Sequence, residues 1–147
     1  MIKDYKAFLL TFIQYSTLPL MMWRMTWFSH YTFLVVLQLV GLFIASWAIW
    51  VMQRSKLNIS PTPRKGAILI TNGIYKWIRH PMYTSLLLTF IPMILSNNYN
   101  ALNSLTFAVF FINLILKLEY EEILLSSFFK EYKNYQSQSW KIIPYLY

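Results

Sequence analysis

The sequence predicts an all-α integral membrane protein with about four transmembrane helices, both termini in the cytoplasm and an amphipathic helix at the C-terminal end. Of its 147 residues, 57% are hydrophobic and only 12% are charged, about half the charge of an ordinary soluble domain. The apolar residues gather in four stretches, and almost all Lys and Arg residues lie on one side of them. We therefore expect a single membrane-embedded domain over residues 1–147.

The four apolar stretches predict membrane spans at about 7–23, 31–52, 81–96 and 101–118. A helix needs roughly 20 residues to cross the hydrocarbon core, so the second stretch is long enough alone and the third is the weakest candidate. Backbone groups in hydrocarbon must be bonded internally, which favours helices over open strands. The first stretch lacks a small-residue cleavage site, so we expect a retained anchor rather than a removed signal peptide.

The positive charges predict the orientation. Twelve of the 13 Lys and Arg residues lie at the N-terminus, in the middle loop 53–80 and beyond residue 116, whereas the other two connections share only Arg24. Cytoplasmic loops carry the excess of Lys and Arg, so we expect the active site on the cytoplasmic side, in a bacterial inner membrane. In so apolar a chain the net charge of +8 is expected to face anionic lipid headgroups and not nucleic acid.

Composition also excludes several classes of site. The chain has no cysteine, which rules out disulfides and thiolate chemistry. Its three glycines are too scattered for a dinucleotide-binding or P-loop fingerprint. With two histidines and a single aspartate, Asp4, neither a zinc cluster nor a catalytic triad can be assembled, so no metal is expected.

The fourth helix is expected to continue beyond the membrane into a C-terminal helix and tail, residues 119–147. Three- and four-residue spacing places Glu121 and Glu122 on one stripe with apolar side chains, namely Leu118, Leu125, Phe128, Phe129 and Tyr132. A carboxylate on such a face needs a partner or a ligand, because burying it unpaired costs several kcal/mol or shifts its pKa.

The cytoplasmic edge of the third span, residues 73–83, reads GIYKWIRHPMY. Pro81 suits the first turn of a helix, and the free N–H groups there, with Arg79, predict an anion site. His80 and Tyr83 can face the same side, while Tyr75 and Tyr83 offer aromatic faces to a soft cation. Together with the two carboxylates these groups predict a zwitterionic ligand, and S-adenosylmethionine fits that description.

A two-part motif carries a family resemblance. Arg79-His80-Pro81-Met82-Tyr83, preceded by Gly73-Ile74-Tyr75 and followed by Glu121-Glu122 and Phe128-Phe129-Lys130-Glu131-Tyr132, resembles the isoprenylcysteine carboxyl methyltransferase family, which includes phospholipid methyltransferases. The resemblance covers roughly residues 69–144. It implies a membrane methyltransferase whose tail folds back over S-adenosylmethionine. It implies that His80, Tyr83 and Glu121 or Glu122 bind this cofactor. Together with the helix start and the aromatic faces noted above, the predicted cofactor-binding residues are Tyr75, Arg79, His80, Pro81, Tyr83, Glu121 and Glu122.

The chain departs from the family pattern at four positions. Ile74 stands where proline is usual, Ser85 and Phe129 stand where glycine is usual, and Lys117 stands where arginine is common. A lysine cannot clamp a carboxylate bidentately, which weakens the case for an acceptor that bears a carboxyl group.

The resemblance implies an S-adenosylmethionine-dependent methyltransferase that acts on a lipidic or hydrophobic acceptor, similar to isoprenylcysteine carboxyl O-methyltransferases; the alternative is a phospholipid N-methyltransferase. We expect direct in-line transfer, driven by orientation and exclusion of water, and assign no catalytic residue. Two other classes stay open: an NADPH reductase resembling the steroid 5α-reductases and a small four-helix transporter. Transport normally needs an ionisable residue within the spans, whereas the acidic cluster here lies at the inner boundary.

Overall fold

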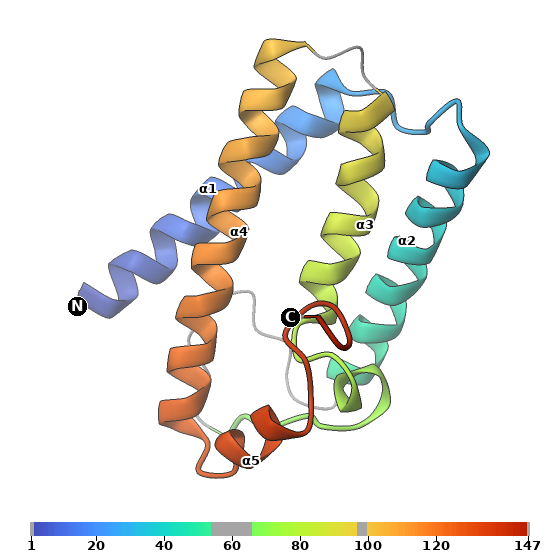
Figure 1. Ribbon diagram of the computed structural model, residues 1–147. Helices are drawn as coiled ribbons and strands as arrows, with labels where there is room; N and C mark the ends of the chain where they lie inside the picture. The colour runs from blue at the N-terminus through green and yellow to red at the C-terminus, as the bar shows by residue number, and fades with distance from the viewer. Residues whose placement is uncertain (1, 54–65, 97–99, 147) are drawn as a thin grey trace.

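The computed structural model describes residues 2–53, 66–96 and 100–146, and this part of the chain is all-α, as predicted (Figure 1). The elements in chain order are α1 (Ile2–Arg24), α2 (Thr32–Met52), the 3-10 helix η2 (Gly73–Lys76), α3 (Pro81–Ser96), α4 (Ala101–Phe128) and α5 (Tyr132–Ser137). Of the expected cofactor loop 53–80, residues 54–65 lie outside the described residues.

Two helices, α2 and α4, are long and apolar enough to cross a membrane. Helix α3 is apolar but shorter, with 16 residues, and α1 has 23 residues but is less apolar. Helix α2 also turns large apolar side chains outward, because Phe33, Phe43 and Trp50 are all at least 64% exposed. Such a broad exposed apolar face is typical of a surface that meets lipid or a partner.

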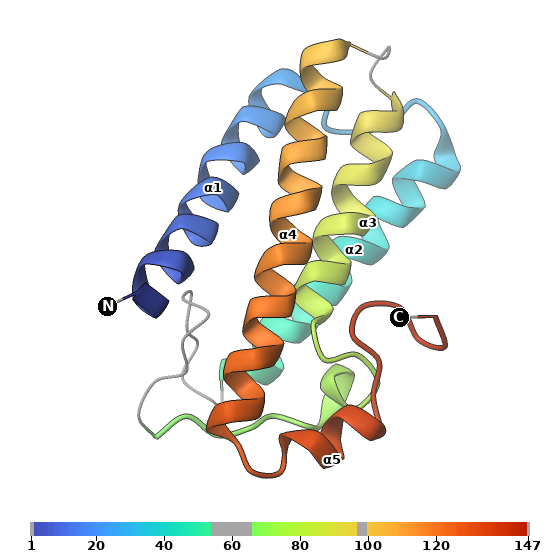
Figure 2. The ribbon, with the colours of Figure 1, turned by 60° about the vertical axis from the view of Figure 1, so that its left-hand side comes forward.

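The helices pack in two pairs, α1 with α4 and α2 with α3, as both views show (Figures 1 and 2). Between α1, α3 and α4 lies the largest apolar cluster, in which Met21, Phe110, Leu114 and Leu118 are completely buried. A smaller cluster joins α2 to η2 through Ala48, Val51, Ile74 and Tyr75. The second cluster fixes the loop before α3 against the end of α2.

Helices α2 and α3 approach closely at Gly41. A Cβ atom built there would lie 2.8 Å from Oγ1 of Thr89 and 3.0 Å from the carbonyl oxygen of Ser85. Small residues at such crossings let helix backbones come together in membranes. The side chain of Ser85 is buried and donates a 2.7 Å hydrogen bond to the carbonyl of Met82 within α3. The small side chain of Ser85 is therefore compatible with the close approach of α2 and α3 at Gly41.

The C-terminal part differs from the single continuous stripe that the spacing predicted. Helix α4 runs without a break to Phe128, so Glu121 and Glu122 belong to the long helix itself. The chain then leaves helical geometry at Phe129, with φ −106° and ψ 120°, and α5 contains only six residues. The prediction of one helical stripe through Tyr132 was wrong because the chain reverses at Phe129.

The tail after α5 returns to the residues that precede α3. Residues 78 and 140 form a parallel β-bridge: the Trp140 N–H donates to the Trp77 carbonyl at 3.0 Å, and the Arg79 N–H donates to the Trp140 carbonyl at 2.8 Å. The next N–H, that of His80, donates to the Lys141 carbonyl at 3.0 Å. The tail therefore lies directly against the segment that the sequence analysis singled out.

Candidate active site

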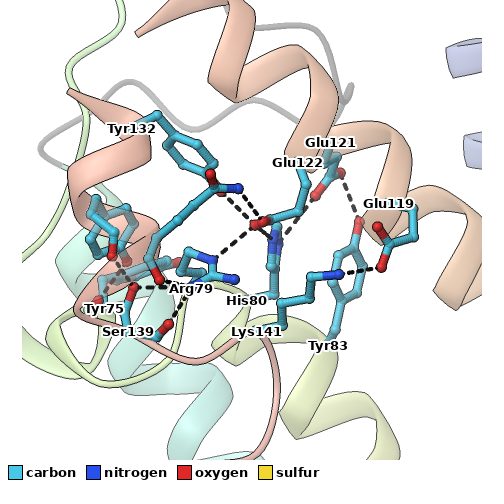
Figure 3. Close-up of polar contacts among 12 residues, drawn as sticks. Tyr75, Arg79, His80, Tyr83, Glu119, Glu121, Glu122, Tyr132, Ser139 and Lys141 are labelled. Atoms are coloured by element: carbon cyan, nitrogen blue, oxygen red, sulfur yellow. Dashed lines mark hydrogen bonds and ion pairs between the residues drawn. The ribbon is translucent and has the colours of Figure 1, made fainter. Parts of the chain in front are cut away.

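The candidate site lies where the first turn of α3 meets the C-terminal turns of α4, α5 and the returning tail (Figure 3). Helix α3 begins at Pro81, as predicted, and Pro81 is fully buried. The His80 carbonyl accepts hydrogen bonds from the N–H groups of Tyr83 at 3.0 Å and Thr84 at 3.2 Å. Because proline has no N–H group, its place at the helix start leaves no donor unsatisfied.

Glu122 is a buried carboxylate that receives four hydrogen bonds from the chain itself. Its Oε1 atom lies 2.7 Å from Nε2 of His80 and accepts from the Tyr132 hydroxyl at 2.6 Å. Nε of Arg79 donates to the same oxygen at 3.1 Å, and Nε2 of Gln136 donates to Oε2 at 2.8 Å. The side chain is only 6% exposed. Its hydrogen-bonding capacity is largely used within the protein.

Glu121 has a different environment, although it is adjacent in the sequence. Its Oε1 atom accepts a 2.7 Å hydrogen bond from the Tyr83 hydroxyl. Its Oε2 atom lies 3.6 Å from Nδ1 of His80, an ion-pair distance that is too long for a hydrogen bond. The side chain is 19% exposed. Glu121 therefore keeps an oxygen that can accept a hydrogen bond from a ligand.

His80 lies between the two carboxylates, with one ring nitrogen toward each (Figure 3). Burial lowers its pKa, but the interactions with the Glu121 and Glu122 carboxylates outweigh this effect, so the pKa is raised above its usual value. The ring stacks on Tyr83 with centroids 5.5 Å apart, so the two side chains face the same side, as their spacing predicted.

The guanidinium group of Arg79 connects α3 to the tail. Besides Glu122, it hydrogen-bonds through Nη1 to the carbonyl oxygens of Gln136, at 3.1 Å, and Ser139. The side chain is 7% exposed. Instead of facing solvent as part of an anion site, the group is directed toward Glu122 and α5, where it holds the tail in place.

Tyr75, on η2, contributes a hydroxyl group with unused capacity. Its backbone carbonyl accepts a 2.5 Å hydrogen bond from the Tyr135 hydroxyl. Its own hydroxyl is buried and has no hydrogen-bond partner among the described residues. Burial and the charge of Glu121 raise the pKa of Tyr75, so the group is a neutral donor. A buried polar group without a partner is rare and calls for an explanation, such as a ligand.

The structure also adds residues that the sequence analysis did not assign to the site. Tyr132 lay on the predicted stripe, but its contact with Glu122 was not foreseen, and Gln136 and Ser139 carried no sequence signal. Next to the site, a cavity of about 480 Å³ opens between the loop before α3 and α5. Its lining comprises Leu69, Thr71, Lys76, Trp77, Glu131, Asn134, Tyr135, Gln138 and Trp140. In the described part of the chain, no group of side chains is suited to hold a metal ion.

A comparison with protein families gives a match. The family model described as phospholipid methyltransferase matches residues 29–132, a stretch that extends from just before α2 to the first residue of α5. It contains all seven residues singled out from the sequence. Neither the curated proteins nor the solved structures contain a match to the chain.

Proposed function

The chain belongs to the phospholipid methyltransferase family, and from this we propose that it transfers a methyl group to the amine of a phospholipid headgroup at the membrane surface. Members of the family are S-adenosylmethionine-dependent membrane methyltransferases, so the type of enzyme and the cofactor follow from membership. The match favours a phospholipid acceptor over the isoprenylcysteine carboxylate that the sequence analysis put first, and supports neither a reductase nor a transporter.

The candidate site fits this cofactor. S-adenosylmethionine carries an ammonium group and ribose hydroxyls, which need acceptors, and a carboxylate, which needs donors. The open Oε2 atom of Glu121 and the unpartnered hydroxyl of Tyr75 are acceptor and donor of this kind. We infer that Tyr75, His80, Tyr83 and Glu121 hold the cofactor, whereas Arg79, Pro81 and Glu122 keep the site in shape. When bound, S-adenosylmethionine supplies an electrophilic methyl group on a sulfonium centre.

The contribution of the chain is orientation and charge. Tyr83 fixes one oxygen of Glu121, so the carboxylate presents its other oxygen in a set direction. A fixed negative charge in a largely buried site favours cationic groups more strongly than the same charge would in water. The returning tail covers the start of α3 and limits the access of water. Alignment of the reacting groups lowers the barrier to direct in-line transfer without a covalent intermediate.

We also propose that the single domain, residues 1–147, spans the membrane four times with the site on the cytoplasmic side. Helices α2 and α4 meet the length and apolarity of a span, and α1 and α3 pack beside them. The site lies at the end of the bundle where residues 66–80, the described part of the middle loop, lead into α3, and this is the side predicted as cytoplasmic. A lipid acceptor would reach the site laterally from the bilayer.

Ligand-dependent melting of the purified protein in detergent tests the assignment. A ligand that binds only the folded state raises the melting temperature by mass action. S-adenosylhomocysteine should do so, and NADPH should not. The acceptor is tested by offering phosphatidylethanolamine and a farnesylated cysteine with a free carboxylate as competing substrates. Methylation of the farnesylated cysteine alone would return the assignment to the carboxyl methyltransferases.

A further inference from the structure

A buried cation that the candidate site does not use lies on α4 beside α1. The side chain of Lys117 is 4% exposed, and its Nζ atom donates a 2.6 Å hydrogen bond to Oε1 of Gln14. Across the described residues, no carboxylate lies within ion-pair distance of this ammonium group. Ionisable residues inside membrane helices are costly and usually mark a functional site. Lys117 therefore has no carboxylate in direct contact, and the carboxylate that acts on it electrostatically is Glu121.

The position of Lys117 relative to Glu121 indicates which further anion Lys117 can bind. Four residues separate the two, so they lie on the same face of α4, about 6 Å apart along the helix axis. Lys117 is nearer the middle of the helix, next to the fully buried Leu114 and Leu118. Glu121 is nearer the end where the loop, α5 and the tail meet (Figure 3). From the apolar interior outward, the order is therefore cation, then carboxylate.

We propose that Lys117 binds the phosphate of the phospholipid acceptor and thereby places the headgroup amine beside Glu121. This inference rests on the proposed function and names the part of the acceptor that is recognised. In phosphatidylethanolamine the order from the bilayer outward is acyl chains, phosphate and amine, which matches the order of charges on α4. Two carbon atoms join the phosphate ester to the amine, a separation comparable to one helical turn.

A lysine at this position suits the binding of a phosphate better than the bidentate binding of a carboxylate that an arginine would provide. An ammonium group acts on a phosphate as a point charge and needs no bidentate geometry. The hydrogen bond from Nζ to Gln14 engages one of its three N–H donors and fixes its direction. Among the described residues the other two N–H groups of Lys117 make no hydrogen bond, and the proposal assigns them to phosphate oxygens. Because Gln14 lies on α1 and Lys117 on α4, the proposal places the phosphate where these two helices meet.

The test is native mass spectrometry of the purified full chain with two competing lipids that have the same acyl chains, phosphatidylethanolamine and diacylglycerol. The wild-type protein should prefer the phospholipid by about 10-fold or more, the effect of one charge-assisted hydrogen bond. Lys117→Met should remove this preference, and Lys117→Arg should retain it. Lys130→Met, at an exposed position, is the matched control. Soluble glycerophosphoethanolamine should compete only weakly if the lipid, and not a free phosphate ester, is the ligand.

An unchanged preference in Lys117→Met would overturn the proposal and leave Lys117 as a packing partner of Gln14. Stronger competition by glycerophosphoethanolamine than by the lipid would also overturn it, in favour of a soluble phosphate ester. Retained binding of S-adenosylhomocysteine shows that the Lys117→Met protein is folded. If Lys117→Met does not fold, Lys117→Gln is used in its place. Because lipid binding is measured without turnover, failure of this proposal can be distinguished from failure of the proposed function, which is shown by a wild-type protein that methylates no phospholipid.

Discussion

The Tyr83 hydroxyl donates a 2.7 Å hydrogen bond to Oε1 of Glu121 and so joins the first turn of α3 to α4. His80, which stacks on Tyr83, contacts the neighbouring Glu122 at 2.7 Å. The adjacent Glu121 and Glu122 thus each contact a side chain from residues 80–83. Glu122 is enclosed by donors from the chain, whereas Glu121 keeps an open oxygen, and this difference leads to distinct predictions for the two residues.

The first prediction separates the two glutamates. Glu122→Gln should lower the melting temperature because the change removes a charge that Arg79 and His80 share. Glu121→Gln should leave the melting temperature closer to the wild-type value but weaken binding of S-adenosylhomocysteine about 10- to 150-fold, the loss expected for one charge-assisted hydrogen bond. Calorimetric titration and thermal melting measure the two effects.

Glu131→Gln and Glu119→Gln serve as controls for these variants. Glu131 is exposed at the start of α5 and does not lie on α4. Glu119 lies on α4 and pairs with Lys141 at 2.5 Å, outside the cluster around His80. Neither change should alter cofactor affinity. Equal affinities in all four variants would contradict the assignment of Glu121.

The second prediction concerns pH. The pKa of His80 in the folded protein is raised above its usual value of 6.5. The folded state therefore gains stability from protonated His80, fully below about pH 6.5, and loses it as pH rises through the folded-state pKa. Melting curves of the wild-type protein should show this loss as the pH rises above about 6.5, and His80→Asn should not. Parallel pH profiles for the two proteins would show that His80 is not charged in the fold.

The third prediction concerns the contact between α2 and α3. Gly41→Ala forces a Cβ atom against Thr89 and the carbonyl of Ser85, so it should destabilise the protein by about 1–3 kcal/mol, the usual cost of overpacking. Ser46→Ala, on an exposed part of the same helix, should change stability by less than about 0.5 kcal/mol. Thermal melting in detergent compares them. A fully tolerated Gly41→Ala would mean that the helices do not approach as described.

The fourth prediction concerns topology. Reporters fused after Tyr147 and inserted near Thr62, which lies outside the described residues, should both report the cytoplasm. A reporter inserted near Asn100, at the opposite end of α4 from the site, should report the other side. A signal from outside the cytoplasm at Thr62 would contradict the four-span arrangement.

Much of the fold could be predicted because its signals are local. Apolar stretches marked α2 and α3 to within one residue, and Pro81 fixed the start of α3. The different environments of Glu121 and Glu122 could not be predicted, because Tyr132 and Gln136 reach Glu122 only after the reversal at Phe129. The contact between Lys117 and Gln14 likewise joins residues 103 positions apart, and no local periodicity reports such a pair.

The central claim is that the chain methylates a phospholipid with the site around Glu121. The most direct test is mass spectrometry of phosphatidylethanolamine vesicles that contain the purified protein and S-adenosylmethionine. The wild-type protein should add the mass of one methylene unit to the headgroup, Glu121→Gln should greatly reduce this product, and Glu131→Gln should not. An unmethylated lipid in the presence of wild-type protein that still binds S-adenosylhomocysteine would contradict the claim.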